Sequence, residues 1–279
     1  MESVYLIKFY ESLINLSKNT IAKHKSQLKK YLELFKSYPV QHEVDIIENL
    51  ETVKNDSMRL SLLKTISKFR KINGLPNDKI LLLMKNTNDI LAQKYKERNV
   101  KIKQDNSLPT YEHMVDELNK LYKEGEWKKY IINYLLLYIN VRNRDLDLKI
   151  VRNKSDANDD NTNYIVIKKS SALFIRNVYK TSKTYGKKIH IIKSKKFIKA
   201  VNEFLGDDES KDLLGYDLKT TSNLSNVVRR LTINKIKESD VLKIVLASKN
   251  SLDQATKIGL NRGTNVETLN SNYNTEIAI

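Results

Sequence analysis

The chain of 279 residues contains no cysteine, only three prolines and only seven glycines. The lack of cysteine excludes a disulfide framework and a thiolate metal site, and it is compatible with a reducing compartment. Because turn residues are scarce, we expect helices to dominate. No run approaches the roughly 18 apolar residues that a membrane span needs, and the start MESVYLIKFYES lacks the pattern of a signal peptide. We therefore expect an intracellular protein with no membrane partner.

Charge of one sign is in excess. Lysine and arginine number 50 against 33 acidic residues, which gives a net charge of +17 and a pI of about 9.6. Residues 1–97 hold 17 basic and 11 acidic residues, a surplus of 6, and the remainder holds 33 and 22, a surplus of 11. Both halves thus carry the charge, as expected when two basic bodies hold a polyanion between them. The alternative is a basic protein whose charge only keeps it soluble.

The first 98 residues read as a bundle of four or five short helices. SKNTIAKHKSQLKKYLELF begins at Ser17, a plausible N-cap, and has apolar residues at helical spacing. The lysines on the polar face of this segment are candidate DNA contacts, namely Lys23, Lys25, Lys29 and Lys30. Residues 99–109 are polar and without periodicity, so we expect a linker there. Residues 110–279 then form a second domain.

The second domain is predicted to be α-rich with one small antiparallel sheet. Thr110 is a suitable N-cap for its first helix, and EWKKYIINYLLLYINV forms a buried apolar helix. The segments YIVIKK, SALFIRNVY and KKIHII are typical of strands, and Gly186 marks the turn before the last one. The remainder reads as helical. We thus expect a mainly α protein made of a helical bundle followed by an α-rich domain.

Four motifs follow one another along this second domain. They are YINVRNRDLDLKI with Arg142 and Asp145, SKTYGKKIHII with Lys183, NLSNVVRRLT with Arg229, and RGTNVETLNSNYN with Tyr273. An Arg, Lys, Arg, Tyr order on a helical domain with one β-hairpin resembles the tyrosine recombinase (phage integrase) family. The start SKNTIAKHKSQLKKYLELF is also similar to the beginning of that family's helical core-binding domain. The resemblance extends over nearly the whole chain, from about residue 5 to 275.

The resemblance implies a role for each matching residue. Tyr273 takes the position of the nucleophile, Arg142 and Arg229 those of the phosphate clamp, and Lys183 that of the general acid. Asp145 stands in for the carboxylate of the Arg-x-x-Glu pattern. Lys180 and Arg230 are alternatives to Lys183 and Arg229. At the family's two histidine positions this chain has Asn226 and Thr264, which can donate a hydrogen bond but cannot act as a base near neutral pH.

These residue types suit the cleavage of a phosphodiester. Two guanidinium groups bind phosphoryl oxygens through paired planar donors and stabilise the charge that builds up there during attack. Tyrosine is a weak nucleophile at its usual pKa of about 10 and needs such a positive field. A lysine can protonate the leaving 5′-oxygen. A phosphotyrosine intermediate conserves the ester linkage, so the resemblance implies neither a metal nor an energy cofactor.

The resemblance further implies a site-specific recombinase or integrase that closes around duplex DNA as a C-shaped clamp. Several protomers, expected as a tetramer on paired sites, assemble because strand exchange needs one protomer for each cleaved strand. Two other functions remain open. One is a type IB topoisomerase-like enzyme, which shares the chemistry without synapsis, and the other is a degenerate recombinase that only binds DNA. The small size, the abundance of lysine, asparagine and isoleucine that is typical of an AT-rich genome, and the two missing histidines suggest a mobile-element or viral enzyme. We expect it to act on DNA in the cytoplasm or nucleus.

Overall fold

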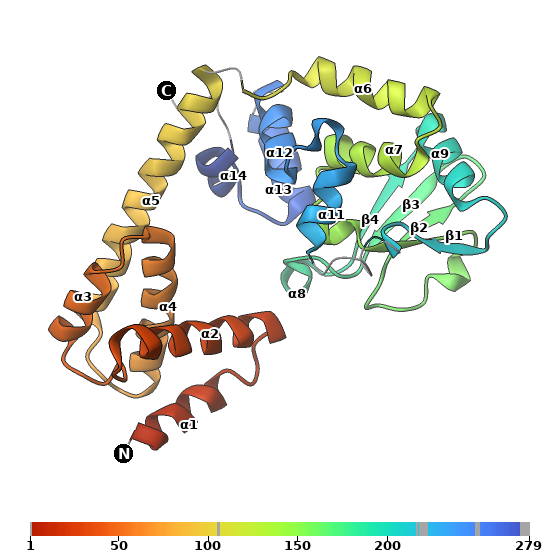
Figure 1. Cartoon of the computed structure of the whole chain (residues 1–279). Coiled ribbons are helices and arrows are strands. Elements are labelled where there is room, and N and C mark those ends of the chain that lie inside the picture. Colours follow the sequence, from red (N-terminus) through yellow and green to blue (C-terminus); the bar gives the residue numbers. More distant parts are fainter. Residues whose placement is uncertain (1, 105–106, 216, 218–222, 249–251, 274–279) are drawn as a thin grey trace. The chain divides into compact units, whose positions relative to one another are not determined.

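The computed structural model describes the chain except for residues 1, 105–106, 216, 218–222, 249–251 and 274–279. The chain forms two compact units, Met1–Tyr95 and Lys96–Ile279, called unit 1 and unit 2 below. It is mainly helical with one small sheet (Figure 1), which confirms the expected fold class. Among the described residues, no helix has the length and apolar character that would let it cross a membrane.

Unit 1 contains only helices among its described residues. They are α1 Glu2–Ser12, α2 Lys18–Phe35, α3 Glu43–Glu51, α4 Asp56–Ile72 and the first part of α5 Asp78–Gln104. The Ser17 hydroxyl accepts a hydrogen bond from the Thr20 amide at 3.3 Å, which confirms the predicted N-cap of α2. The apolar faces of the helices meet in two clusters, one around Tyr31, Leu62 and Ile66 and the other around Phe9 and Phe69.

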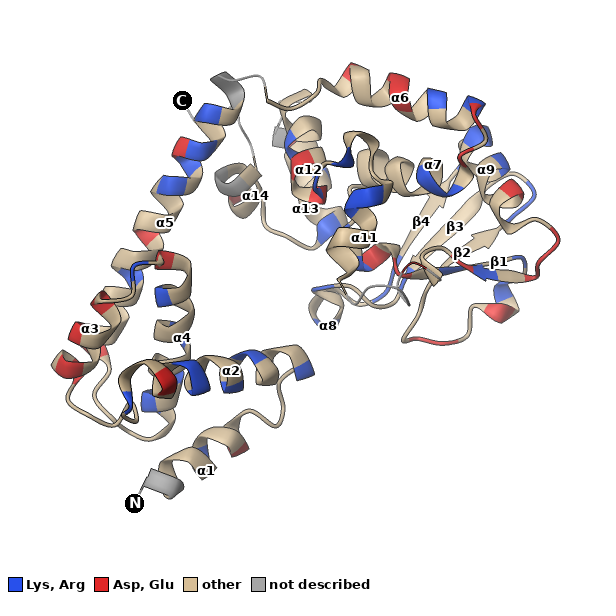
Figure 2. Ribbon diagram, in the orientation of Figure 1, with Lys and Arg blue, Asp and Glu red and all other residues tan. Residues whose placement is uncertain are grey.

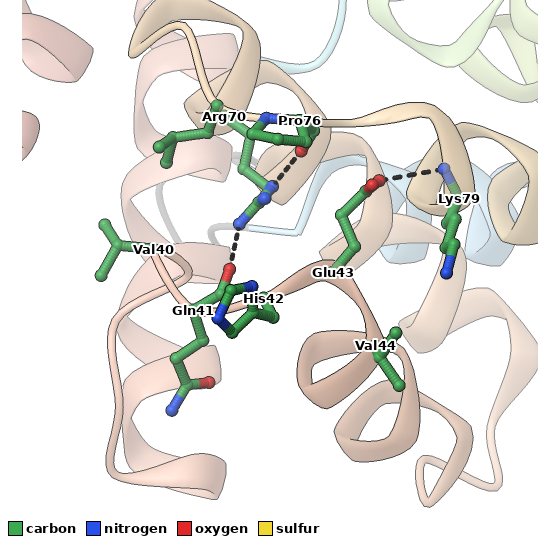
Figure 3. A pocket seen from close by; sticks show the side chains of 9 residues that line it. Val40, Gln41, His42, Glu43, Val44, Arg70, Pro76 and Lys79 are labelled. Carbon is green, nitrogen blue, oxygen red and sulfur yellow. Dashed lines mark hydrogen bonds between the residues drawn. The ribbon is translucent and has the colours of Figure 1, made fainter.

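A buried arginine joins the connections between these helices (Figure 3). Arg70 is 1% exposed, and its guanidinium donates to the carbonyls of Pro76 at 2.6 Å, Gln41 at 2.8 Å and Pro39 at 3.1 Å. Glu43 accepts from the Lys79 amide at 2.9 Å and so caps the start of α5. The cavity of about 470 Å³ beside these groups is lined by side chains that hold the loops together.

The first part of the expected linker over 99–109 is helical. Residues 99–104 continue α5 without a break, and Asn99 is 2% exposed. The segment NVKIKQ is polar, but lysine and glutamine are good helix formers and no glycine or proline interrupts it. Polarity alone therefore did not indicate a loop, and the division between the units lies at Tyr95 and Lys96 instead.

Unit 2 alternates helices with a sheet. Its helices are α6 Tyr111–Lys123, α7 Trp127–Tyr134, α8 Ser182–Tyr185, α9 Lys195–Leu205, α11 Leu224–Leu231, α12 Glu238–Ser248, α13 Leu252–Arg262 and α14 Val266–Tyr273. Its strands are β1 Leu148–Val151, β2 Asn163–Ile167, β3 Ala172–Arg176, β4 Lys188–Ile192 and β5 Ser210–Asp212. The Thr110 hydroxyl accepts from the His113 amide at 3.1 Å, which confirms the predicted N-cap of α6.

The sheet differs from the predicted small antiparallel one. Its strand order is β4-β3-β2-β1-β5, and β1 pairs with β2 in parallel while the other pairs are antiparallel. Strands β1 and β5 were not predicted, since they have only four and three residues. Strand β2 alternates between two faces: Ile165 belongs to the main core under the helices, whereas Tyr164 and Val166 belong to a small cluster on the other face.

Candidate active site

Arg142 lies in a loop that follows the buried helix of unit 2. After α7 the chain continues as a π-helical segment, Leu135–Ile139, which ends at Asn140 with a left-handed φ of 57°. Arg142 then precedes a 3₁₀ turn, Asn143–Leu146. The sequence had predicted a helix that reaches Arg142. The structure shows that the helical segment ends before Arg142, at Asn140. Because of this break in the main chain, Arg142 lies outside the regular rotation of the preceding helix.

Asp145 fixes this loop from inside the unit. Its Oδ2 accepts the Arg142 amide at 2.9 Å and the Arg176 Nη2 at 2.6 Å, and the side chains of Asp145 and Arg176 are both 0% exposed. Burial raises the pKa of Asp145, and the nearby Arg176 opposes this rise. The Arg142–Asp145 pair is therefore no surface pair of a helix. Asp145 binds the main chain of one arginine and the side chain of another.

The C-terminal end of α13 collects basic side chains from three distant segments. Three successive carbonyls accept hydrogen bonds: Leu260 from Lys188, Asn261 from Arg176 at 2.5 Å, and Arg262 from Arg142. The last carbonyls of a helix lack partners within the helix and carry a partial negative charge, so they attract cations. These bonds bring the end of β3, the start of β4 and the loop of Arg142 to one place.

The Gly263-Thr264 pair lies in the same place. The Arg142 guanidinium also donates to the Thr264 hydroxyl, and the Thr181 hydroxyl donates to the Gly263 carbonyl at 3.2 Å. Gly263 has a φ of +60°, and a Cβ here would lie 2.1 Å from the Thr181 Oγ1. Only glycine permits both this conformation and this close approach. The hairpin segment that carries Lys183 thus contacts the segment that leads to Tyr273.

Helix α11 adjoins the loop of Arg142 as well. The Asn143 amide group donates to the Ser225 hydroxyl at 3.2 Å, and Arg229 lies one helical turn beyond Ser225, on the same side of α11. Arg229 is exposed and its Nε donates to the Lys235 carbonyl at 2.9 Å. Asn226 is also exposed, on the first turn of the same helix. The arginine of the third motif is therefore near the loop of the first.

The lysines of the β3–β4 connection differ in their surroundings. Lys180 and Lys183 are exposed and, among the described residues, form no hydrogen bond or ion pair; Lys183 lies in α8, between paired strands as predicted. Lys188 is half-buried, and its ammonium lies 5.4 Å from the ring centre of Tyr179 and 5.2 Å from that of Tyr185. Burial, Arg176 and Arg142 lower the pKa of Lys188.

Tyr273 is the last residue of α14. This helix starts two residues after Thr264, and the Asn265 side chain accepts from the Thr268 amide at 2.8 Å near its start. Tyr273 is partly buried and packs against the main core of unit 2. Its hydroxyl forms no hydrogen bond to the described side chains of Arg142, Lys183 or Arg229. Although its sequence is polar, this segment forms a packed helix as far as Tyr273.

The positive charge of the cluster exceeds its negative charge. Arg142, Arg176, Arg262 and Lys188 provide four cations, whereas Asp145 and Glu238 provide two carboxylates. Burial and the repulsion from Arg262 lower the pKa of Arg142, a sign that the cations crowd each other. Because the partly exposed Arg142 guanidinium retains unused donors, the cluster can bind an anion there and stabilise added negative charge on it.

Several of these residues could not be identified from motifs. Arg176 and Glu238 lie outside the four motifs, Arg262 begins the last motif but had no role assigned to it, and Lys188 was one lysine among many in its segment. Strand alternation is the signal that could have indicated Lys188. Ile189 and Ile191 are exposed at 54% and 64%, so Lys188 and His190 share the opposite face of β4.

The four candidate DNA-binding lysines lie on α2 of unit 1. Lys23, Lys25, Lys29 and Lys30 are all exposed, and Figure 2 shows the basic residues along this helix. Lys29 is 3.8 Å from Glu33, and the Lys25 ammonium is 5.4 Å from the ring centre of Tyr10. Such weak, solvated contacts leave the lysines available to phosphate groups.

His190 provides a prediction for the stability of unit 2. Its ring stacks on Phe174 with centroids 5.9 Å apart, and burial, Arg176 and Lys188 lower its pKa to about 4. The unfolded state, with a pKa of about 6.5, then binds a proton first as the pH falls. Stability should therefore decrease between about pH 6.5 and pH 4, and His190→Gln should remove on the order of 2 kcal/mol of this decrease. Urea unfolding at several pH values, followed by the fluorescence of the single tryptophan, Trp127, measures the difference. Equal pH slopes for both proteins would contradict the prediction.

No protein-family model and no curated protein sequence matches the chain. Among solved structures, the crystal structure of XerA recombinase is similar to it at 17% sequence identity, and the match covers 100% of this chain and 96% of that chain. The TM-score of this match is 0.35. A likeness at this level carries no weight for function, which has to be inferred from the site itself.

Proposed function

We propose that the chain cuts and rejoins duplex DNA through a 3′-phosphotyrosine intermediate, as a site-specific recombinase of the tyrosine recombinase type. One observation carries this proposal. The Arg142 guanidinium binds the Arg262 carbonyl and the Thr264 hydroxyl, across 120 and 122 positions of the sequence. This contact unites the first and the last of the four motifs around a cluster with excess positive charge.

In the proposed reaction the two motif arginines bind the scissile phosphate. Arg142 uses the donors that its contacts with α13 and Thr264 leave unused, and Arg229 approaches from α11 by exchanging its bond to Lys235. Thr264 accepts a hydrogen bond from Arg142, so the proton of its own hydroxyl is available to a phosphate oxygen. Asn226 offers its amide group from the exposed side of α11. These donors supply binding and orientation without a histidine.

The covalent step exchanges one ester for another. The phenol oxygen of Tyr273 forms a bond to phosphorus, its proton passes to water, and the bond from phosphorus to the 5′-oxygen breaks. A lysine of the β3–β4 connection gives a proton to that oxygen. Lys183 comes from the exposed helix α8, and Lys188 is held beside the arginines, so both are candidates for this role. The reverse sequence rejoins the strand without ATP or a metal.

The proposed partner is double-stranded DNA inside the cell, contacted by the lysines of α2 and by the cluster of unit 2. Full strand exchange cleaves four strands, so four protomers on two paired sites are needed, each with one tyrosine. Duplex binding through the lysines would weaken steeply with salt.

Covalent trapping tests the proposal without knowledge of the target site. The protein is incubated with a pool of random-sequence duplexes that carry 5′-bridging phosphorothiolate linkages, whose sulfur leaves without a proton donor and cannot rejoin. We expect a protein–DNA adduct attached to the peptide of α14. A pool that yields no adduct, although it binds, would leave a protein that only binds DNA. Relaxation of supercoiled plasmid without any site preference would favour the topoisomerase-like alternative.

Arg142→Lys should reduce the rate of adduct formation by roughly 10²- to 10³-fold. Lysine keeps the charge but offers no pair of planar donors, so it cannot bind Thr264, the Arg262 carbonyl and a phosphate together. Nonspecific affinity for duplex DNA should change little, because the net charge is the same. The rate is measured on the trapping substrate at saturating protein. A rate within threefold of the wild type, a range of about 0.7 kcal/mol, would exclude Arg142 from the clamp.

A further inference from the structure

Arg262, the first residue of the last motif, has an unusual set of contacts for a residue to which the motif assigns no role. It is 4% exposed, and its Nη1 donates to the carbonyls of Asn140 and Val141, both at 3.0 Å. Its Nη2 binds the Glu238 carboxylate, while its own carbonyl accepts from Arg142. The side chain of Arg262 thus binds the main chain directly before Arg142, and the side chain of Arg142 binds the main chain of Arg262.

The Arg262 guanidinium binds the main-chain carbonyls of the two residues directly before Arg142. The carbonyls of Asn140 and Val141 follow the π-helical segment, where the chain has left the helix and main-chain acceptors need other partners. A guanidinium can reach two carbonyls and one carboxylate at once because its donors diverge in one plane, which lysine cannot do. Arg262 therefore fixes the position of the main chain directly before Arg142.

Glu238 completes the arrangement. Its side chain is 16% exposed and lies in the first turn of α12, where a negative charge is favourable. One carboxylate oxygen of Glu238 binds Arg262, and the other accepts a hydrogen bond from the main-chain N–H of Asn143 at 3.4 Å. Glu238 thus neutralises the buried guanidinium and binds the same loop on the far side of Arg142.

We propose that Arg262, together with Glu238, is a positioning residue that holds the loop of Arg142 against the segment carrying Thr264 and Tyr273. It touches no reacting atom. Its effect on catalysis rests on the function proposed above, whereas its effect on the two segments does not. Without Arg262, the Arg142 guanidinium would lose its fixed place relative to α14, and a displacement of about 1 Å at a reacting group can cost roughly 10²-fold in rate.

Arg262→Met and the matched variant Arg152→Met separate this role from general stability. Arg152 also binds two carbonyls of unit 2, those of Gly206 and Asp208 at 3.2 Å, so its replacement removes the same charge and the same kind of bond elsewhere. Hydrogen exchange followed by mass spectrometry is the first measurement. In Arg262→Met, peptides spanning 140–146 and 263–273 should exchange on the order of tenfold faster, with β2 and β3 unchanged. In Arg152→Met these two regions should exchange as in the wild type.

Adduct formation on the phosphorothiolate pool is the second measurement. Arg262→Met should form adduct roughly 10²-fold more slowly than Arg152→Met, with equal affinity for duplex DNA, and Glu238→Gln should show an intermediate loss. Unchanged exchange in both regions would overturn the proposal, as would fast exchange combined with an unchanged adduct rate. If even the wild-type protein forms no adduct, the proposed function fails, and the exchange data alone then decide whether Arg262 joins the two segments.

Discussion

Tyr273→Phe is expected to abolish the covalent DNA adduct completely while leaving duplex affinity unchanged. The substitution removes only the phenol oxygen, which is the atom proposed to bond to phosphorus. The ring, which packs against the core of unit 2, remains, so α14 should keep its place. Gel analysis after denaturation measures the adduct, and fluorescence anisotropy with a labelled duplex measures the affinity.

Tyr138→Phe is the control for this experiment. Tyr138 is a 39% exposed tyrosine of unit 2, and the loss of its hydroxyl should leave the adduct yield as in the wild type. A full yield of adduct from Tyr273→Phe would show that another residue is the nucleophile, and the chain's other 14 tyrosines would then be the first candidates. An adduct lost in both variants would point to a loss of structure instead.

The buried pair of Asp145 and Arg176 should give the largest change in stability. Asp145→Leu leaves the Arg176 guanidinium charged and buried without its partner, and Arg176→Met does the same to the Asp145 carboxylate. Each single variant is expected to lower the free energy of unfolding of unit 2 by about 3–5 kcal/mol. The double variant removes both charges and should recover most of that loss. Urea unfolding followed by Trp127 fluorescence yields all four values of the cycle.

The exposed pair of Lys29 and Glu33 provides the contrast. Their side chains are 78% and 59% exposed, so Glu33→Leu should change the free energy of unfolding of unit 1 by less than about 1 kcal/mol. Circular dichroism follows this variant, because the tryptophan belongs to unit 2.

If the losses from Asp145→Leu and Arg176→Met simply added in the double variant, the two side chains would not interact as the structure has them.

Local signals explain which parts of the fold could be predicted. The N-caps Ser17 and Thr110 and the apolar spacing of the helices act within a few residues, so the sequence reveals them directly. Strands β1 and β5 exist through partners 15 and 59–63 positions away, and their own few residues carry almost no signal. The helical course of residues 99–104 was missed because polarity was given more weight than helix propensity.

The residues of the candidate site also divide into those that the sequence could predict and those that depend on distant partners. The order of Arg142, Lys183, Arg229 and Tyr273 could be recognised, because motif spacing is a property of the sequence. Arg176 and Arg262 could not, since their roles depend on carbonyls and carboxylates that only the folded chain brings within reach. The sequence also shows that a threonine occupies position 264, but not that its hydroxyl accepts a hydrogen bond from Arg142.

The π-helical segment before Arg142 has a consequence of its own. A π turn contains one residue more than an α turn, so the five residues Leu135–Ile139 rotate the chain about as far as four residues of an α-helix would. Deleting one residue from this segment would therefore let an ordinary α-helix form there and leave Arg142 facing nearly the same way. Deleting one residue from α7, which has no π turn to absorb the loss, would rotate the following chain by about 100° and would disable the arginine while leaving every proposed catalytic side chain in the sequence.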